Sequence, residues 1–564
     1  MLLAFVLSLF VGRLLQLQGL DAATYAEVAT KERLRSKVLP ATRGQITDRH
    51  GIALATTVDA RNVTADPELV TDVDGTAAAL APILHADRRV LAARLARPGT
   101  RFVYLAKSVT PRTWGRIEAL RLPGVFGEPV AKRVYPGADL AANIVGFVDA
   151  EGRGGGGLEL ALDQQLAGRD GRATYEIGSG GKHIPTATNS ETQPVPGADV
   201  QLTIDRDIQW LAQQAIAEKV MAADAESGTV VVTDPRTGEI LAMATAPTFN
   251  PAAVGRAEAA NRGNRAVSEI YEPGSTGKLL TAAAAIETGA MTPGTPVTVP
   301  TVLHRAGTTF HDHSPHGVLN LTFAGVVAKS SNMGTIMAGE QVGFPRLYDY
   351  MRKFGIAQST GLGFPGESRG LLPDPKDWWV STPYTLAFGQ GYSINALQGH
   401  AVYATIANDG VRVTPSLVKG YIGDDGRVTP APPPAKARVV SAKTARTVRT
   451  MLEAVTGEGG TAPQAKIPGY RVAGKTGTAN RVVDGAYQGF TASFIGFAPA
   501  DRPQLVVSVV LQDPKRGHYG GVLCAPVFKE VMSFALQSRK VPPTGSKAPK
   551  LPLETGGDTS DGDG

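Results

Sequence analysis

The sequence predicts a mixed α/β (α+β) fold, in which a sheet flanked by helices is joined to a second folded unit. Two observations lead to this fold class. Strand-like stretches lie at both ends of the C-terminal part, with helix-like stretches between them, so one sheet is assembled from distant segments. A loop-rich stretch ending near Gly197 separates this part from the N-terminal part, and 564 residues are enough for at least two folded units.

The composition excludes several classes of protein. Apolar residues make up 43% of the chain and charged residues 19%, which argues against wholesale disorder. The single cysteine, Cys524, excludes an internal disulfide and a cysteine-based zinc site. A net charge of +6 permits attraction to anionic polymers or lipid head groups but is weak evidence for nucleic acid, which we do not expect as a partner.

The chain begins with an apolar run, Met1–Gly12, which is interrupted only by Ser8 and followed by Arg13. A spanning helix needs about 20 apolar residues, and the leucines after Arg13 extend the run if the arginine reaches the membrane surface. The basic start and the cleavage site of a signal peptide are not evident. We expect residues 1–17 to be a single membrane anchor, truncated at its start; the alternative is a buried helix of a soluble protein.

Residues 18–195 are predicted to form a non-catalytic pedestal domain. Asp21–Arg35 has a helical pattern, Gly44–Ala65 alternates polar and apolar residues as strands do, and residues 70–125 look helical. We interpret the glycine run Gly154–Gly157 as a flexible surface loop, which a short helical segment follows.

Residues 196–540 are predicted to form the catalytic domain. A strand leads to Asp205, which can cap a helix with Ile208, Leu211 and Ala215 on one face. Pro526–Leu536 reads as a closing helix. The strands expected in the main sheet are Thr229–Thr233, Glu239–Ala244, Thr491–Phe497 and Gln504–Leu511. Residues 541–564 are rich in proline and glycine and end acidic, so we expect a disordered tail.

A serine followed three residues later by a lysine is the first candidate for nucleophilic chemistry. The pattern occurs at Ser275–Lys278, Ser179–Lys182 and Ser416–Lys419. The lysine can act as a base for the serine only where both share a helix face. Ser275 opens an Ala/Leu-rich helical stretch, whereas Ser179 lies in a glycine-rich loop and Ser416 in a strand-like stretch. We therefore predict Ser275 as the nucleophile, at a helix N-terminus that favours developing negative charge.

Ser330 and Asn332 follow the end of a second helical stretch. The hydroxyl can relay a proton to a leaving amine, and the amide can hold a substrate amide. The alternative is ordinary C-capping of the helix by the asparagine. A second Ser-x-Asn pattern occurs at Ser393–Asn395.

Lys475, Thr476, Gly477 and Thr478 form the third candidate, a strand-like motif that occurs once. The lysine supplies a cation suited to a carboxylate, the threonines supply hydroxyls, and Gly477 lets another backbone approach closely. A basic turn is the alternative.

Four histidines lie close together in one segment, at positions His304, His311, His313 and His316, with Asp312 among them. Their spacing differs from the His-x-x-x-His pattern that zinc hydrolases place on a helix, and no cysteine supports them. We interpret the segment as a polar loop near Ser330 and predict no metal site and no cofactor.

The three motifs occur together, in this order, in serine penicillin-binding proteins and β-lactamases. Arg43–Gly51 also resembles the Arg-Gly-x-Ile-x-Asp-Arg-x-Gly signature of class B penicillin-binding proteins. Other stretches similar to that family are residues 156–171, 234–251, 388–398 and 492–503. From Arg13 to about Leu536 the chain thus resembles a division-type, penicillin-binding protein 3-like peptidoglycan D,D-transpeptidase.

The resemblance implies an extracytoplasmic transpeptidase domain, similar in fold to β-lactamases, on a pedestal of the dimerisation type with one anchor in the bacterial cell membrane. Ser275 would attack the bond between two terminal D-alanines with Lys278 as base, and the N–H groups of Ser275 and Thr478 would stabilise the oxyanion. Ser330 and Lys475 would pass the proton to the departing D-alanine.

The family also implies the remaining contacts and partners. Thr476 and Thr478 would bind the terminal carboxylate of the stem peptide, and β-lactams would acylate Ser275. A membrane glycosyltransferase and other division proteins are the expected partners. A role in elongation, a β-lactamase and a β-lactam sensor stay open as alternatives. The catalytic residues do not reveal the acceptor of the crosslink or the oligomeric state.

Overall fold

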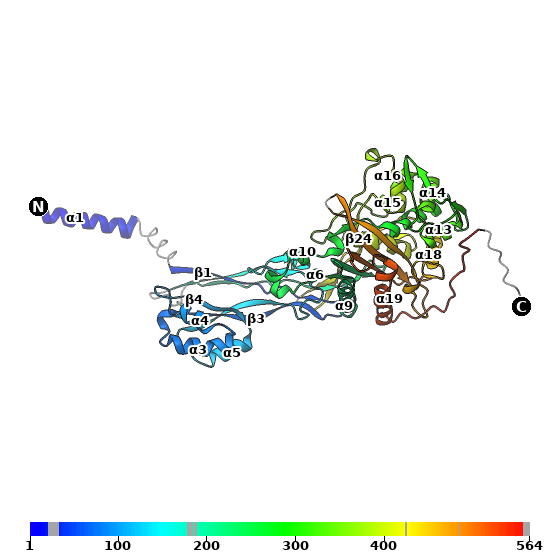
Figure 1. Ribbon diagram of the computed structural model, residues 1–564. Coiled ribbons are helices and arrows are strands. Elements are labelled where there is room, and N and C mark those ends of the chain that lie inside the picture. The colour runs from blue at the N-terminus through cyan, green and yellow to red at the C-terminus, as the bar shows by residue number, and fades with distance from the viewer. Residues whose placement is uncertain (21–32, 178–183, 185–188, 424–425, 484, 556–564) are drawn as a thin grey trace. The chain divides into compact units, whose positions relative to one another are not determined.

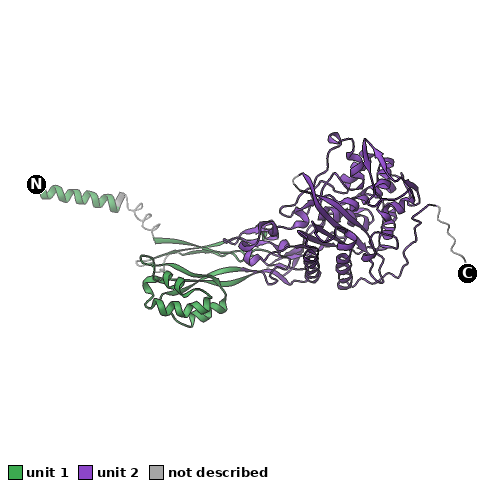
Figure 2. Cartoon of the chain, in the orientation of Figure 1, with its two compact units in different colours: residues 1–44, 57–132, 164–198 green, residues 45–56, 133–163, 199–564 purple. Residues whose placement is uncertain are grey.

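The computed structural model describes residues 1–20, 33–177, 184, 189–423, 426–483 and 485–555 (Figure 1). The chain divides into two compact units, which Figure 2 shows in separate colours. Unit 1 comprises residues 1–44, 57–132 and 164–198, and unit 2 comprises residues 45–56, 133–163 and 199–564. The chain therefore passes between the units several times before the catalytic part begins.

The apolar start of the chain forms helix α1 (Leu2–Leu15), in which no side chain is buried, followed by a π-helical turn at Gln16–Leu20. In the part of the chain that is described, no helix has both the length and the apolar character needed to cross a membrane. The helix expected at Asp21–Arg35 lies mostly outside the described residues. The helix prediction is wrong for its last two residues, because Leu34 and Arg35 begin strand β1 (Leu34–Leu39).

Unit 1 contains two sets of strands. In the first, β1 and β9 (Ser190–Thr192) lie on either side of β8 (Gly171–Glu176). In the second, β3 (Ala53–Ala65) pairs with β4 (Val103–Val109) and β5 (Val125–Val134). Together with the short β2 (Ile46–Thr47), β3 confirms the strands predicted within 44–65.

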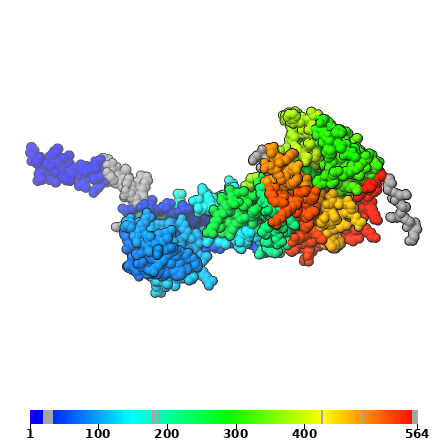
Figure 3. Space-filling view, in the orientation of Figure 1, coloured from blue at the N-terminus to red at the C-terminus, as the bar shows by residue number. Residues whose placement is uncertain are grey.

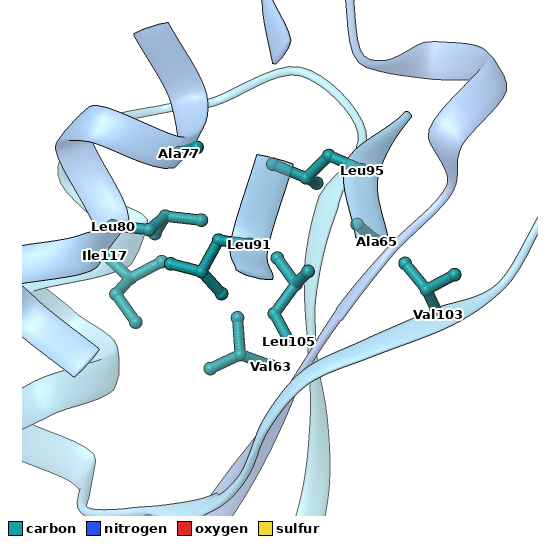
Figure 4. Close-up of a cluster of buried hydrophobic side chains, with 9 residues drawn as sticks. All are labelled: Val63, Ala65, Ala77, Leu80, Leu91, Leu95, Val103, Leu105 and Ile117. Carbon is teal, nitrogen blue, oxygen red and sulfur yellow. The ribbon is translucent and has the colours of Figure 1, made fainter. Parts of the chain in front are cut away.

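Three helices and the β3–β4 pair enclose the hydrophobic core of unit 1 (Figure 4). The helices are α3 (Val73–Leu84), α4 (Arg88–Leu95) and α5 (Pro111–Glu118), each begun by a capping side chain. The core side chains are Val63, Ala65, Ala77, Leu80, Leu91, Leu95, Val103, Leu105 and Ile117. The prediction of helix throughout 70–125 is wrong at β4, where a short apolar run with alternating burial completes the sheet.

The prediction of a flexible surface loop is also wrong for the glycine run. Gly154–Gly156 forms strand β7, which pairs with β6 (Phe147–Val148), and α7 (Gly157–Ala161) and α8 (Asp163–Leu166) follow. A Cβ placed at Gly146 would collide with the backbone of Gly156. The glycines thus serve a close approach of two backbones, which composition alone does not distinguish from a flexible loop.

The main sheet of unit 2 has five antiparallel strands in the order β12–β11–β25–β24–β23. Their bounds are β11 (Ser227–Thr233), β12 (Ile240–Ala246), β23 (Ala473–Val483), β24 (Ala486–Ala498) and β25 (Leu505–Gln512). The four strands predicted for this sheet are confirmed, and so is its assembly from the two ends of the domain.

Helices cover both faces of this sheet. Helix α9 (Arg206–Ala223) is capped by the Asp205 carboxylate, as predicted, and contacts α19 (Gly520–Ser538). On the opposite face, His400 of α17 (Ala396–Ala407) lies within hydrogen-bond distance of Thr233 Oγ1 (2.7 Å) and Ser508 Oγ (3.0 Å). Helix α19 begins six residues before the predicted closing helix, at Gly520 rather than Pro526.

The remaining elements of unit 2 lie between these strands in the sequence or precede them. The helices are α6 (Ala142–Val145), α10 (Ala259–Arg262), α11 (Arg265–Ser268), α12 (Lys278–Glu287), α13 (Phe323–Lys329), α14 (Asn332–Val342), α15 (Phe344–Lys353), α16 (Thr382–Phe388) and α18 (Ala442–Thr456). The short strands are β10 (Asp199–Leu202), β13 (Ile270–Tyr271), β14 (Pro296–Val299), β15 (Leu303–Arg305), β16 (Thr308–Phe310), β17 (Leu319–Thr322), β18 (Ile394–Asn395), β19 (Val411–Val413), β20 (Val418–Ile422), β21 (Val428–Pro430) and β22 (Lys436–Arg438).

Within the predicted tail, residues 541–555 run along the surface of unit 2 and contact it. The Tyr470 hydroxyl donates to Val541 O at 2.5 Å, and Ser546 Oγ donates to Asp501 Oδ2 at 2.7 Å. In Figure 3 the red C-terminal segment lies beside the green surface of the domain. The segment is polar on average but carries leucines at alternate positions near its end, Leu551 and Leu553. An apolar pattern this short has little effect on the average composition from which the tail was predicted.

Candidate active site

Ser275 lies in a turn of 3-10 helix, Gly274–Gly277, that leads directly into α12. The helix start predicted for this serine is therefore confirmed. The backbone on both sides of Ser275 is fixed, because Gly274 N–H donates to Gly389 O (2.9 Å) and the Tyr403 hydroxyl donates to Thr276 O (2.9 Å). The position of the nucleophile thus depends on groups from two other parts of the domain.

Ser330 brings the three motifs together. It ends α13 in the left-handed conformation, with φ of 64°. Its Oγ lies 3.0 Å from Ser275 Oγ, 3.2 Å from Lys278 Nζ and 2.9 Å from Lys475 Nζ. The alternative of C-capping by asparagine is wrong, since Ser330 is the capping residue and Asn332 begins α14.

Lys278 reaches this centre from the first turn of α12. Its Nζ donates to Ser330 O at 2.5 Å as well as to Ser330 Oγ. The residue is only 2% exposed, and burial lowers its pKa to about 7, although the nearby Asp312 carboxylate opposes this shift. The lowered pKa favours a neutral amine near neutral pH, which is the form that can accept a proton.

Lys475 is buried to the same degree, at 1% exposure. Burial and the positive charge of Lys278 lower its pKa well below the usual range. Two ammonium groups that both contact one hydroxyl repel each other, so the site favours a state with fewer than two charges. Such a pair can exchange a proton through Ser330 Oγ.

Thr476, Gly477 and Thr478 lie on β23, the edge strand of the main sheet, as the strand prediction required. A Cβ at Gly477 would lie 3.0 Å from Pro273 O and would collide with Ser493 Oγ, so this position needs glycine for a close approach. Thr476 Oγ1 lies 2.9 Å from Thr461 Oγ1, and Thr478 Oγ1 accepts a hydrogen bond from Gly520 N–H at 3.3 Å.

Asn332 lies at the rim. Its Nδ2 donates to His311 O at 3.0 Å, which ties the start of α14 to the histidine-rich loop. The side chain is half-buried, and the residue lines the same cleft as Ser275.

The motifs surround a cleft of about 700 Å³. Five of the eight predicted site residues line it, whereas Lys278, Lys475 and Gly477 are buried and do not. Residues that the motifs did not reveal also line it, from segments far apart in the sequence: Asp312, His313, His316, Gln390, Thr461, Gln464, Asn480, Phe490, His518, Tyr519 and Val522. They give the cleft both aromatic and polar walls.

Residues 228–533 match the family described as the penicillin binding protein transpeptidase domain, and residues 38–202 match the penicillin-binding protein dimerisation domain. This chain belongs to the penicillin-binding protein family. The predicted family, the transpeptidase fold and the dimerisation-type N-terminal domain are thereby confirmed, and the chain is an enzyme of the peptidoglycan D,D-transpeptidase family.

Several members of this family resemble the chain over nearly its whole length. Penicillin-binding protein PbpB of Mycolicibacterium smegmatis is 40% identical, over 97% of this chain and 91% of that protein. Peptidoglycan D,D-transpeptidase FtsI of Escherichia coli is 33% identical, over 96% of this chain and 92% of that protein. The crystal structure of penicillin-binding protein 3 from Mycobacterium tuberculosis, complexed with aztreonam, has a TM-score of 0.72 at 36% identity and covers 92% of this chain and 100% of that one.

Within this penicillin-binding protein, the other Ser-x-x-Lys and Ser-x-Asn patterns that the structure describes make structural hydrogen bonds. Ser416 Oγ donates to Val418 O at 3.0 Å, and Lys419 Nζ is directed to Arg49 O at 3.3 Å. Asn395 caps α17 through a reciprocal pair of hydrogen bonds with Gln398. Ser179–Lys182 lies outside the described residues.

Residues 311–316 of the histidine-rich segment form the predicted polar loop and contribute Asp312, His313 and His316 to the cleft, whereas the first part of the segment forms strands β15 and β16. Asp312 Oδ1 accepts Met333 N–H at 3.0 Å, and Asp312 Oδ2 lies 3.1 Å from His316 Nε2. His304 instead lies 3.1 Å from Thr309 Oγ1, on strand β15. Among the described residues, no three His, Cys, Asp or Glu side chains are arranged to hold a metal ion.

Proposed function

We propose that this penicillin-binding protein crosslinks peptidoglycan stem peptides through an acyl-serine intermediate at Ser275, with release of D-alanine. The observation that carries the proposal is the position of Ser330 Oγ, within 3.2 Å of Ser275 Oγ, Lys278 Nζ and Lys475 Nζ. A hydroxyl in this position connects a nucleophile to two lysines of lowered pKa at the floor of an open cleft.

The acylation step follows from these contacts. Ser275 Oγ attacks the carbonyl carbon between the terminal D-alanines, and its proton passes through Ser330 Oγ to the neutral amine of Lys278. The N–H groups of Ser275 and Thr478 stabilise the oxyanion. Ser330 and Lys475 return a proton to the nitrogen of the departing D-alanine, so the C–N bond breaks and an ester to Ser275 remains.

The other predicted residues hold the donor peptide. Thr476 and Thr478 bind its terminal carboxylate, and Asn332 holds a backbone amide of the stem. An amine of a second stem peptide then attacks the ester, which forms the crosslink and frees Ser275. A β-lactam acylates the same serine, and its adduct persists because the leaving group stays attached.

Release of D-alanine tests the reaction. The purified protein is expected to release D-alanine from a pentapeptide stem and to join that stem to an acceptor amine, and to form a long-lived adduct with fluorescent penicillin. Mass spectrometry of the released products and of the labelled peptide measures both. Rapid turnover of penicillin would favour a β-lactamase instead, and penicillin binding without D-alanine release would favour a sensor.

We further propose that the enzyme acts at the division septum, held at the outer face of the cell membrane by an anchor within residues 1–17. The pedestal is assigned to residues 18–195 and the transpeptidase domain to residues 196–540. The support is the likeness to FtsI and PbpB together with the apolar helix α1, which has no buried side chain. A membrane glycosyltransferase and division proteins are the proposed partners of the anchor and pedestal.

Depletion of the protein separates division from elongation. If the role is septal, depleted cells are expected to grow into filaments without septa, as seen by microscopy with a membrane dye. Rounded cells or defects at growing poles would instead assign the enzyme to elongation. Depletion rescued by a Ser275→Ala protein would show that the phenotype does not depend on transpeptidation.

A further inference from the structure

Near its end, the C-terminal segment pairs with β17 beside the active site through an isolated β-bridge, in extended conformation; residues 551–555 are called the C-terminal strand below. Residues 551–555 run antiparallel to β17, with Leu321 opposite Glu554. Thr322 N–H donates to Leu553 O (3.0 Å), and Thr555 N–H donates to Asn320 O (2.9 Å). Leu551, Leu553 and Thr555 are half-buried while Pro552 and Glu554 are exposed, which is the alternation of a strand.

This strand contacts both ends of α13. At the start, the Thr322 hydroxyl caps the helix by accepting Gly325 N–H (3.0 Å) and donates its own proton to Pro552 O (2.7 Å). At the end, Lys329 Nζ lies 3.1 Å from Glu554 Oε1. The contact at the start is close, because a Cβ at Gly325 would collide with Leu553 O.

Helix α13 is only two turns long, and its capping residue is Ser330. A short helix moves as a rigid body, so a displacement of its first turn reaches Ser330 with little loss. The contacts of Ser330 with Ser275, Lys278 and Lys475 all lie near 3 Å and lengthen if the helix moves. Leu319, Leu321 and Lys329, which the segment contacts or adjoins, also line the cleft.

We propose that residues 551–555 are a positioning strand of the active site, which holds α13 so that Ser330 Oγ stays in contact with Ser275 and the two lysines. The strand touches neither the substrate nor the reacting atoms. The proposal rests on the proposed role of Ser275 and Ser330 in acylation. It predicts that loss of the strand slows acylation more than it weakens binding of the β-lactam.

Two truncated proteins isolate the strand. One ends at Lys550 and the other at Thr555, so both lack residues 556–564 and they differ only in the five residues of the strand. At saturating penicillin, the acylation rate constant is expected to fall roughly three- to tenfold in the protein ending at Lys550, with little change in the dissociation constant of the initial complex. The protein ending at Thr555 is expected to match the full chain. Stopped-flow measurement with fluorescent penicillin gives both constants.

Gly325→Ala provides an independent test, since the added methyl group excludes Leu553 O while alanine suits a helix. In the full chain it is expected to slow acylation as truncation does. In the protein ending at Lys550 it is expected to have no further effect, because no strand is left to displace. Hydrogen exchange of the peptide containing Thr322, whose N–H is bonded to Leu553 O, reports loss of the strand in each protein.

Two results would overturn the proposal. One is an equal acylation rate constant in the proteins ending at Lys550 and Thr555, which would make the strand a stabilising element alone. The other is an equal effect of Gly325→Ala in both chain lengths. A full chain that forms no adduct at Ser275 would refute the proposed function itself, and that outcome is distinct from both. If the Gly325→Ala protein fails to fold, the two truncations still decide.

Discussion

A protein carrying Ser275→Ala is expected to form no adduct with fluorescent penicillin and to release no D-alanine from a pentapeptide stem. The reason is chemical, because the methyl side chain has no oxygen with which to form the acyl bond. The substitution removes one atom, at a residue whose backbone is held by Gly389 and Tyr403 through neighbouring groups, so the fold is expected to survive. Labelling on a denaturing gel and thermal unfolding measure the two effects.

Ser416→Ala is the matched control for this experiment. Ser416 belongs to the other Ser-x-x-Lys pattern that the structure describes, and its hydroxyl bonds to Val418 O. The control protein is expected to be labelled at the same rate as the unmodified protein. Labelling that survives Ser275→Ala would contradict the assignment of the nucleophile, whichever other serine carried it.

Replacement of Lys278 by methionine is expected to lower the acylation rate constant by about 10²–10⁴-fold, the range in which a positioned base contributes. Methionine retains most of the buried volume but cannot accept a proton. Lys278→Arg is expected to be similarly inactive, since a guanidinium stays protonated. Lys419→Arg, in the second Ser-x-x-Lys pattern, is the control that is expected to keep full activity.

The unmodified protein should show the corresponding dependence on pH. Burial lowers the pKa of Lys278 to about 7, so the amine is mostly protonated below that pH and mostly neutral above it. Acylation is therefore expected to rise about tenfold per pH unit below 7 and to level off above it. Stopped-flow rates between about pH 5 and 9 measure this profile. A rate that does not change across this range would exclude Lys278 as the base.

Local patterns were sufficient to select Ser275 as the candidate nucleophile and to predict most strands of the main sheet. Ser275 could be distinguished from Ser416 because the helical and strand periods place a residue three positions later on the same or the opposite face. Four of the five strands of the sheet, β11, β12, β24 and β25, could be predicted because alternation and β-branched residues are visible within a few positions. Such signals depend only on neighbouring residues along the chain, so they can be read without the tertiary structure.

The errors arose where burial is decided by distant partners. Val103–Val109 became a strand because β3 offers an edge to pair with, and the glycines near Gly154 are packed because Gly146 approaches them. The C-terminal segment contacts unit 2 as far as Thr555 because β17 pairs with it. The partners of Val103–Val109 and of the C-terminal segment lie in distant parts of the sequence, and those of the glycines lie in the neighbouring turns; a local pattern does not show either contact.

The sequence by itself determined which residues are candidates for the reaction. It predicted Ser275, Lys278, Ser330, Asn332 and the strand motif beginning at Lys475, because the side-chain chemistry and the spacing of each motif can be read within a short segment. Only the tertiary structure decided that Ser330 Oγ lies between the serine and both lysines, and that burial lowers the pKa of each lysine. Those properties depend on desolvation and on distances between segments up to 200 residues apart, which only packing of the whole domain creates.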